Sequence, residues 1–413
     1  MSASSSVPEA EPATSRPQSR RVEIAVVGGG IVGLGIAEEL QRAGHEVLLI
    51  DPDPAGGASF AAAGMLAPVT EFHFEEESLQ QQLLASAALW PAFAERLCGA
   101  SETAEKTSVG YRTEGTLLVG FDPADAQEID QLTQAQALGG LPVERLSRQD
   151  AMQREPLLAD GFRRAYWDPH DHQVDPRQVT RALLERVPVH RARVQALDTT
   201  DDAVRLLTDS GELSAEQVVV AAGLGSAGIA GLPVTLPLRP VYGDILRLSV
   251  PVHLRPLLTH VVRAVVRGRP VYLVPREDDT VVIGATQRED GAASPSAGGV
   301  YQLLRDAQLL VPAVAELGLD EVTARARPGT PDNMPLLGRI AGRLVVATGF
   351  FRHGVLLTPL AASWCREVVE GREPDGLRAW DPFRFSRAEG TDQSDTPSTA
   401  RFEPRFNTRG VSA

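Results

Sequence analysis

The sequence predicts an α/β fold in which a Rossmann-type domain is interrupted by a second, antiparallel-sheet domain of α+β type. Three observations lead to this prediction. A strand–helix–strand pattern occupies residues 21–51, a block rich in β-branched residues occupies 234–283, and a strand followed by a helix returns at 343–370. Strands that alternate with helices are typical of a parallel sheet, whereas a run of strands is typical of an antiparallel one.

Residues 22–51 are the clearest unit. A β-branched run at 22–27 is followed by Gly28-Gly-Gly-Ile-Val-Gly33, a helical pattern to Ala43, and a second strand at 46–50 that ends in Asp51. Glycines at 28, 30 and 33 match the dinucleotide fingerprint, which is specific only between a strand and a helix with an acid about 20 residues further on. We therefore expect the helix N-terminus to bind a diphosphate and Asp51 to bind ribose hydroxyls. The motif does not separate NAD from FAD.

The remaining elements follow in order along the chain. Helices are expected at 75–97, from 122 onward, at 175–186, 300–310 and 355–370, and extended segments at 110–121, 163–167, 187–196, 204–213, 217–225 and 343–349. The polar, aperiodic ends, residues 1–20 and 386–413, are expected to be disordered. We assign 21–105, 147–233 and 327–385 to the nucleotide-binding domain, and 106–146 and 234–326 to the second domain.

Composition excludes several classes of function. Of 40 basic residues only Lys106 is a lysine, and it stands in a polar stretch, so lysine-based catalysis is not expected. The net charge of -14 argues against nucleic acid and anionic membrane as partners. No apolar run approaches the ~20 residues of a membrane span, and the N-terminal segment lacks the apolar region of a signal peptide. We therefore expect a cytoplasmic protein.

Two further segments are rich in small residues. Gly56–Ala67 contains Ser59, whose hydroxyl can donate to a phosphate, and Met65, which offers a polarizable surface to a ring. Gly349–Thr358 places amide donors before an apolar helix. By physical reasoning alone, an ordinary small-residue loop explains either segment about as well.

The chain resembles the D-amino-acid-oxidase-like FAD-dependent oxidoreductases, and among them most closely the glycine oxidases of thiamine biosynthesis. The resemblance spans about residues 22–371. Its motifs are the N-terminal βαβ unit, Ser59-Phe-Ala-Ala-Ala-Gly-Met-Leu66, Val218-Val-Val-Ala-Ala-Gly223, Tyr272-Leu-Val-Pro-Arg276, Val282-Ile-Gly-Ala-Thr286, Arg327-Pro-Gly-Thr-Pro-Asp-Asn-Met-Pro-Leu-Leu-Gly338 and Gly349-Phe-Phe-Arg-His-Gly-Val-Leu-Leu-Thr-Pro359. It implies a glutathione-reductase-like FAD-binding domain and a substrate-binding domain.

The resemblance also implies roles for individual residues. The positions expected to bind FAD are Gly28, Gly30, Ile31, Val32, Gly33, Asp51, Ser59, Ala63, Gly64, Met65, Val194, Gly223, Gly349, Arg352, His353, Gly354 and Val355. Arg327 matches the arginine that clamps the substrate carboxylate, and Tyr272 the tyrosine that hydrogen-bonds the same group. Arg352 matches a second arginine near substrate and flavin. These three residues are the expected catalytic set, and no metal is expected.

The implied reaction is oxidative deamination of glycine or a similarly small amine. Hydride transfer from Cα to the flavin needs no protein base if the amine binds in its neutral form. The protein would then contribute to catalysis by orienting the substrate and by electrostatic stabilisation. The products would be glyoxylate, ammonia and hydrogen peroxide, with oxygen as the acceptor and with product hand-off to a thiazole-forming enzyme. A homo-oligomer is expected. The alternatives are a D-amino acid or sarcosine-type enzyme with another acceptor, an FAD-carrying subunit that is inert outside a complex, and an NAD-dependent dehydrogenase.

Departures from the family pattern concern the pocket and the flavin link. Gln287 stands where a methionine lines the pocket in relatives, and Tyr242-Gly-Asp244 replaces a basic-Gly-acidic/amide pattern. Because no cysteine stands near Arg327, we expect non-covalent FAD. His170-Asp-His172 is interpreted as a plain surface loop, and Glu75-Glu-Glu77 as a solvated helix start, with a lid role left open.

Overall fold

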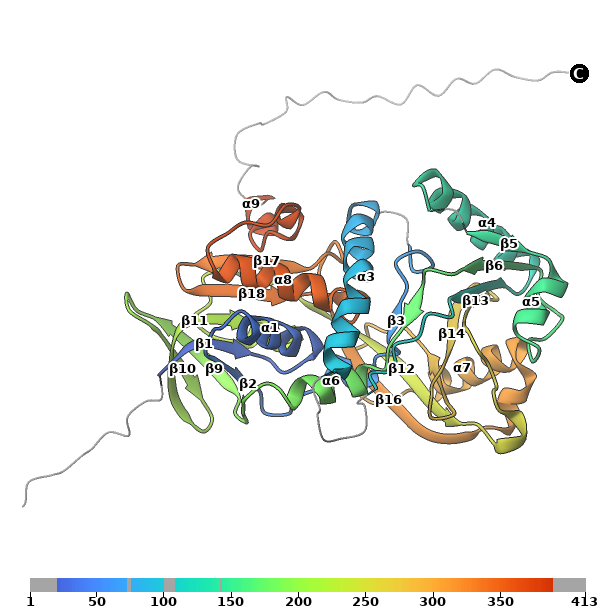
Figure 1. Ribbon diagram of the computed structural model, residues 1–413, viewed down its shortest axis with the longest axis horizontal. Helices are drawn as coiled ribbons and strands as arrows, with labels where there is room; N and C mark the ends of the chain where they lie inside the picture. The colour runs from blue at the N-terminus through green and yellow to red at the C-terminus, as the bar shows by residue number, and fades with distance from the viewer. Residues whose placement is uncertain (1–20, 73–75, 100–107, 142, 389–413) are drawn as a thin grey trace, which may run out of the picture.

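The computed structural model describes residues 21–72, 76–99, 108–141 and 143–388. The N-terminal tail, Lys106 and residues 389–413 lie outside the described residues. Two large sheets lie side by side, with β1, β11 and β18 on the left of Figure 1 and β13 and β14 on the right. The predicted α/β class, with a second sheet inserted into a Rossmann-type unit, is confirmed.

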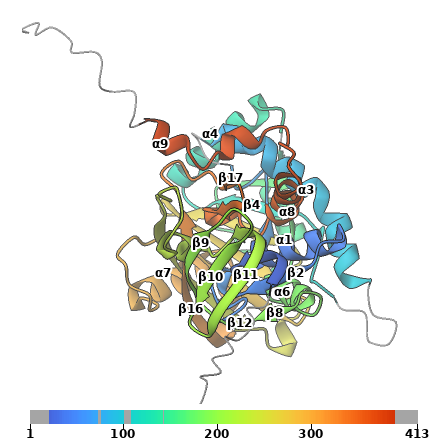
Figure 2. The same ribbon diagram turned by 90° about the vertical axis from the view of Figure 1, so that its left-hand side faces the viewer.

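The first sheet carries the predicted βαβ unit at its centre. Its order is β17-β18-β11-β1-β2-β8, with β9 and β10 attached to β11 as an antiparallel extension that faces the viewer in Figure 2. The pairs β1–β2, β1–β11 and β11–β18 are parallel. The strands are β1 (Arg21–Val27), β2 (Val47–Ile50), β8 (Val189–His190), β9 (Val194–Thr199), β10 (Val204–Thr208), β11 (Gly211–Val220), β17 (Leu336–Ala341) and β18 (Leu344–Thr348).

Helices α1 (Ile31–Arg42), α3 (Glu77–Cys98), α6 (Pro176–Leu184) and α8 (Thr358–Val369) belong to the same half of the molecule. Apolar residues of β1, α1, α3 and α8 share one core cluster, which includes Ile24, Leu34, Trp90 and Leu360. Strands covered on both faces need continuous apolar runs, and all four residues of β2 are buried. Because these strands are continuous apolar runs, they could be predicted from the sequence.

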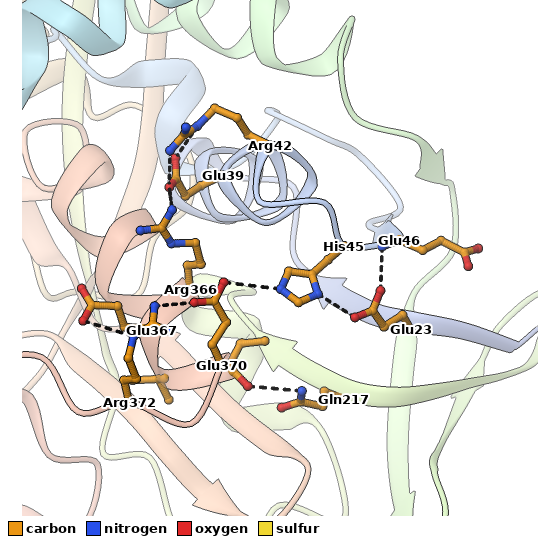
Figure 3. A network of polar contacts seen from close by, with 12 residues as sticks. Glu23, Glu39, Arg42, His45, Glu46, Gln217, Arg366, Glu367, Glu370 and Arg372 are labelled. Atoms are coloured by element: carbon orange, nitrogen blue, oxygen red, sulfur yellow. Dashed lines mark hydrogen bonds and ion pairs between the residues drawn. The ribbon is translucent and has the colours of Figure 1, made fainter.

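A polar network supplements the apolar contact between α1 and α8 (Figure 3). The buried carboxylate of Glu39 on α1 pairs with Arg42 at 2.6 Å and with Arg366 of α8 at 3.0 Å. The ring of His45, after α1, lies 2.6 Å from Glu23 of β1 and 3.6 Å from Glu370. Ionic and hydrogen-bonded contacts therefore join α1 to α8.

The second sheet has the order β16-β12-β15-β14-β13-β4-β6-β5 and is antiparallel except for the β13–β4 pair. Its strands are β4 (Thr116–Gly120), β5 (Glu144–Leu146), β6 (Arg164–Asp168), β12 (Arg239–Ser249), β13 (Val261–Val266), β14 (Arg269–Pro275), β15 (Thr280–Gly284) and β16 (Gly318–Gly329). Helices α4 (Pro123–Leu138), α5 (Arg148–Arg154) and α7 (Ala297–Leu310) accompany it. Its core is a separate cluster that includes Leu117, Leu246 and Leu303.

Short elements complete the fold. They are α2 (Ala58–Ala61), β3 (Met65–Leu66), which pairs with β7 (His172–Gln173), α9 (Arg384–Ala388), and the 3-10 turns Gly223–Gly228, Val252–Leu254, Pro312–Glu316, Phe351–His353 and Leu377–Trp380. None of the helices in the described part of the chain is long and apolar enough to cross a bilayer.

The strand pairing differs from the predicted division of the chain in one place. We expected residues 147–233 to belong wholly to the nucleotide-binding domain, but β6 pairs with β4 and β5 in the second sheet. Phe162, Ala165 and Trp167 lie in the core of that sheet. The expected boundary at residue 147 therefore needs to move to about residue 168. Residues 386–388, which we predicted to be part of a disordered tail, instead belong to α9.

Candidate functional site

A cavity of about 800 Å³ opens between the two sheets, within the usual range for ligand sites. Its walls include the β1–α1 turn, the α2–β3 segment, the end of β11, the residues after β18, and one face of the second sheet. Residues after β2, the connection that follows β3 and part of α4 also contribute to them. The β1–α1 turn, the end of β11 and the residues after β18 lie at carboxyl ends of neighbouring parallel strands. In doubly wound sheets, ligands bind at such ends.

The β1–α1 turn has the backbone geometry that a bound diphosphate requires. Gly28 has φ +114°, and a Cβ atom there would lie 2.4 Å from the carbonyl oxygen of Ala221, so only glycine fits. The N-cap residue of α1, Gly30, makes no side-chain cap hydrogen bond. The first turn of α1 thus faces the cavity with the positive end of the helix dipole.

Two side chains hold this turn in place. Asp51 Oδ2 accepts a hydrogen bond from the Gly29 amide at 2.7 Å, and its Oδ1 accepts one from Asp53 at 2.7 Å. Ser59 Oγ accepts from the Ile31 amide at 2.9 Å. The hydroxyl proton of Ser59 remains available to a phosphate oxygen, and each carboxylate oxygen of Asp51 keeps a lone pair for a ribose hydroxyl.

Most of the residues predicted to bind the cofactor line this one cavity. They are Gly28, Gly30, Ile31, Val32, Gly33, Asp51, Ser59, Ala63, Gly64, Met65, Gly223, Gly349, Arg352, Gly354 and Val355. Val194 and His353 do not line it. Val194 on β9 belongs to an apolar core cluster that includes residues of β10 and β11, and His353 is buried with 1% of its surface exposed.

Tyr272 and Arg327 line the cavity on the face of the second sheet. Arg327 stands on β16, and its guanidinium lies so close to Gly243 of β12 that a Cβ atom there would be 2.5 Å from Nη1. Within the described ranges, no carboxylate pairs with Arg327. Burial raises the pKa of Tyr272 to about 12, although Arg327 opposes that shift, so the phenol stays protonated and can donate.

Arg352, the third predicted catalytic residue, is bound to Glu76. Arg352 Nη1 lies 3.0 Å from Glu76 Oε1, and a second, shorter contact joins Nη2 and Oε2. Burial raises the pKa of Glu76, but His353 and Arg352 outweigh it and hold that pKa at about 2. The prediction of a solvated acidic helix start is therefore wrong at Glu76. Glu75 lies outside the described residues.

The sequence analysis did not predict every cavity residue, and two charged residues that it missed are Glu71 and Arg263. Arg263 Nη1 lies 2.6 Å from Glu71 Oε1 and 3.7 Å from Met65 Sδ. A signal for Arg263 was present, because it interrupts the otherwise apolar strand Val261–Val266, and charged side chains in buried strands need a partner. Glu71 gave no such signal, since it follows a loop of small and polar residues.

The remaining residues singled out in the sequence lie either in the cavity wall or away from it. Gln287 lines the cavity, while Asp244 is buried and pairs with Arg288 at 3.0 Å. Neither Cys98 nor Cys365 lines the cavity. In the described part of the chain no group of three potential ligands could hold a metal. The expectation of a surface loop at 170–172 is wrong for Asp171, which is fully buried.

Comparison with known proteins gives consistent similarities. A family model described as "DAO: FAD dependent oxidoreductase" matches residues 23–368. Glycine oxidase of Geobacillus kaustophilus is 32% identical over 385 residues, covering 89% of this chain and 98% of that protein. The crystal structure of a glycine oxidase from the same organism superposes with a TM-score of 0.81 at 31% identity, covering 89% of this chain and 99% of that one.

The bifunctional protein ThiO/ThiG of Trichormus variabilis is also similar, at 29% identity over 374 residues. The match covers 88% of this chain but 55% of that protein. The chain therefore spans about half the length of its bifunctional relatives.

Proposed function

Because this chain belongs to the DAO family of FAD-dependent oxidoreductases, we propose that it catalyses the oxidative deamination of glycine or a similarly small amino acid. The observation that carries the proposal is Arg327, a guanidinium that lines the cavity beside Tyr272 and that no described carboxylate neutralises. The relatives named glycine oxidase support the same substrate class.

FAD is the cofactor of the family, and the cavity fits it. A Cβ atom at Gly28 or Gly33 would clash with the backbone of Ala221 or of Gly28, so glycine keeps the turn tight. Asp51 and Ser59 offer an acceptor and a donor to the ligand. We assign the diphosphate to the N-terminus of α1, the ribose to Asp51, and the flavin ring to the space between Met65 and Gly349–Val355. When bound, FAD supplies the two-electron redox chemistry that no side chain here provides.

Arg327 and Tyr272 would hold the substrate through its carboxylate. A guanidinium binds a carboxylate with two parallel hydrogen bonds, each worth about 1.5–3 kcal/mol, and the neutral phenol of Tyr272 adds a third donor. Three fixed donors orient a small substrate, so the Cα–H bond is presented in one direction. Among residues of the cavity wall, Arg352 is already paired with Glu76, so we assign it a supporting role at the flavin edge.

The overall reaction consumes glycine, water and oxygen and yields glyoxylate, ammonia and hydrogen peroxide. In the fused relatives the name ThiO/ThiG joins this type of protein to a second one, which supports hand-off of the product to a thiazole-forming enzyme. A cytoplasmic homo-oligomer that uses oxygen is part of the proposal.

An anaerobic substrate panel monitored by bleaching of the flavin absorbance tests the proposal. We expect glycine to bleach the purified protein and oxygen to restore the colour with release of peroxide. Turnover with D-alanine plus a dye, but none with glycine, would replace glycine by a D-amino acid. Full activity of the single chain would eliminate the alternative of a subunit that is inert alone.

A further inference from the structure

The ion pair between Arg263 and Glu71 faces the same end of the cavity as Tyr272. Arg263 on β13 is the register partner of Tyr272 on β14, so the two side chains leave the sheet side by side. Directly opposite residues of an antiparallel pair have Cβ atoms about 4.5–5.5 Å apart. Both residues line the cavity, and Arg263 also reaches Met65.

Glu71 remains ionised in this position. Burial raises the pKa of Glu71, but the nearby Arg263, His353 and Arg352 outweigh that effect and lower it overall. The His353 ring, 3.9 Å from Glu71 Oε2, is itself buried, and burial lowers the pKa of this histidine. Glu71 is therefore the negative partner that neutralises Arg263.

Four of the described arginines line the cavity, and their guanidiniums have different partners. Arg325 donates hydrogen bonds to the backbone carbonyls of Gly56 and Ala324. Arg263 is paired with Glu71 and Arg352 with Glu76, whereas Arg327 pairs with no carboxylate in the described part of the chain. The side chains of both pairs are 11–18% exposed, so solvent screens them little. Beside Tyr272, the guanidinium of Arg327 is therefore the charge that remains for a carboxylate ligand.

We propose that Glu71 is a specificity-determining residue that limits this site to ligands with a single carboxylate. The inference rests on the proposed function, because it takes Arg327 as the carboxylate clamp. A ligand with a second carboxylate would have to approach Arg263 against the fixed charge of Glu71, and a like charge at that distance disfavours binding. Removing the charge of Glu71 frees the guanidinium of Arg263 for the second carboxylate.

The test is binding of acetate and of malonate to the purified holoenzyme, followed by the shift of the flavin absorbance. In Glu71→Gln we expect the affinity for malonate relative to acetate to rise about tenfold, the effect of one added charge-assisted contact. In the double variant Glu71→Gln/Arg263→Gln the gain should disappear. An unchanged ratio in Glu71→Gln, or a gain that survives in the double variant, overturns the inference.

Two further variants serve as a control and as an independent test. Asp306→Asn removes a carboxylate that is likewise paired with an arginine of the second sheet, Arg269, but does not line the cavity, and it should leave the ratio as in the wild type. Arg263→Gln leaves Glu71 uncompensated, so the ratio should fall below that of the wild type even if Glu71→Gln fails to fold. A ratio that does not fall contradicts the inference independently.

The wild type separates this inference from the proposed function. Suppose that the wild type binds acetate and oxidises glycine, but the affinity for malonate relative to acetate does not change in the Glu71 and Arg263 variants. In that case only the inference fails. If neither glycine nor acetate perturbs the flavin, the clamp at Arg327 is wrong and both proposals fall.

Discussion

The guanidinium of Arg327 lies against the backbone of Gly243, so the position of this charge depends on a residue that has no side chain. The two residues come from neighbouring strands, because Arg327 stands on β16 and Gly243 on β12. Sheet pairing therefore fixes both the charge and the space into which it fits. Two different substitutions can separate these contributions.

Removing the charge should weaken substrate binding without disturbing the flavin. In Arg327→Ala we expect KM for glycine to rise about a hundredfold, because two charge-assisted hydrogen bonds are lost. The flavin absorbance should be that of the wild type. Arg145→Ala, at an exposed arginine of the same sheet, is the control and should keep normal kinetics. Unchanged glycine kinetics in Arg327→Ala would remove this residue from the site.

Filling the space should have a related effect by a different route. In Gly243→Ala the new methyl group would stand 2.5 Å from Arg327 Nη1, so the guanidinium must move. We expect Kd for acetate to rise about tenfold, while the thermal midpoint changes little because the guanidinium borders a cavity. Gly298→Ala, where nothing lies within 4 Å of the added carbon, is the matched control. Equal acetate affinity in both variants would contradict the close contact.

Site residues could be predicted from the sequence where neighbouring residues in the chain form a recognisable motif. Gly28, Asp51 and Ser59 were readable because their roles follow from neighbours in the same βαβ unit or adjoining loop. The roles of Glu71 and Glu76 could not be predicted, because each depends on an ion pair with a residue that is distant in the sequence. Glu71 pairs with Arg263, 192 positions away, and Glu76 with Arg352, 276 positions away. Nothing local distinguishes such a carboxylate from a solvated one.

At the scale of elements, the connection that follows β3 is held by a buried acid. Asp171 Oδ1 accepts from the Val69 amide at 3.0 Å, and Oδ2 accepts from the Thr70 amide at 2.8 Å. The next residue along this connection is Glu71, so the loop before β7 fixes one wall of the cavity. Burial, with the charge of Asp168, raises the pKa of Asp171 to about 7.

This shift predicts a pH dependence of stability. The folded state binds the Asp171 proton more tightly than the unfolded state, so the stabilisation is present below the ordinary carboxyl pKa and is lost as pH rises through about 7. We expect the free energy of unfolding in urea to decrease between about pH 5 and about pH 8. Asp171→Asn should flatten this dependence, and Asp150→Asn, at an exposed carboxylate, should not. A slope that persists in Asp171→Asn would assign it to another group.

The elements themselves were predicted unevenly. The buried parallel strands β1, β2 and β18 were predicted within one or two residues, because continuous apolar runs end in glycine or aspartate there. The long edge strand β16 was missed, since its exposed and half-buried residues alternate irregularly. Strand β6 was recognised, but its partner could not be, because sheet membership is decided by pairing with β4.

At the scale of the whole molecule, the cavity exists only where the two halves meet. The β1–α1 turn belongs to the first sheet and Arg327 to the second. A ligand that fills the space between them binds only the folded chain, so it must stabilise the fold.

Removal of FAD should reveal this coupling and the nature of the link. At a free FAD concentration about a hundred times Kd, the free energy of unfolding should exceed that of the apoprotein by about 2.7 kcal/mol. Neither Cys98 nor Cys365 lines the cavity, so acid precipitation should release all of the flavin into the supernatant. Flavin that stays with the precipitated protein would contradict a non-covalent link.

The parallel pairing of β11 with both β1 and β18 joins segments from the two ends of the described chain. On the ribosome, the turn at Gly28 emerges early, whereas Gly349–Val355, the opposite wall of the cavity, emerges more than 300 residues later. At the ordinary pace of synthesis, about 5–20 residues per second, tens of seconds separate the two. A nascent chain arrested before β18 should therefore fail to retain flavin. Cofactor binding is then a late event in the synthesis and folding of the protein.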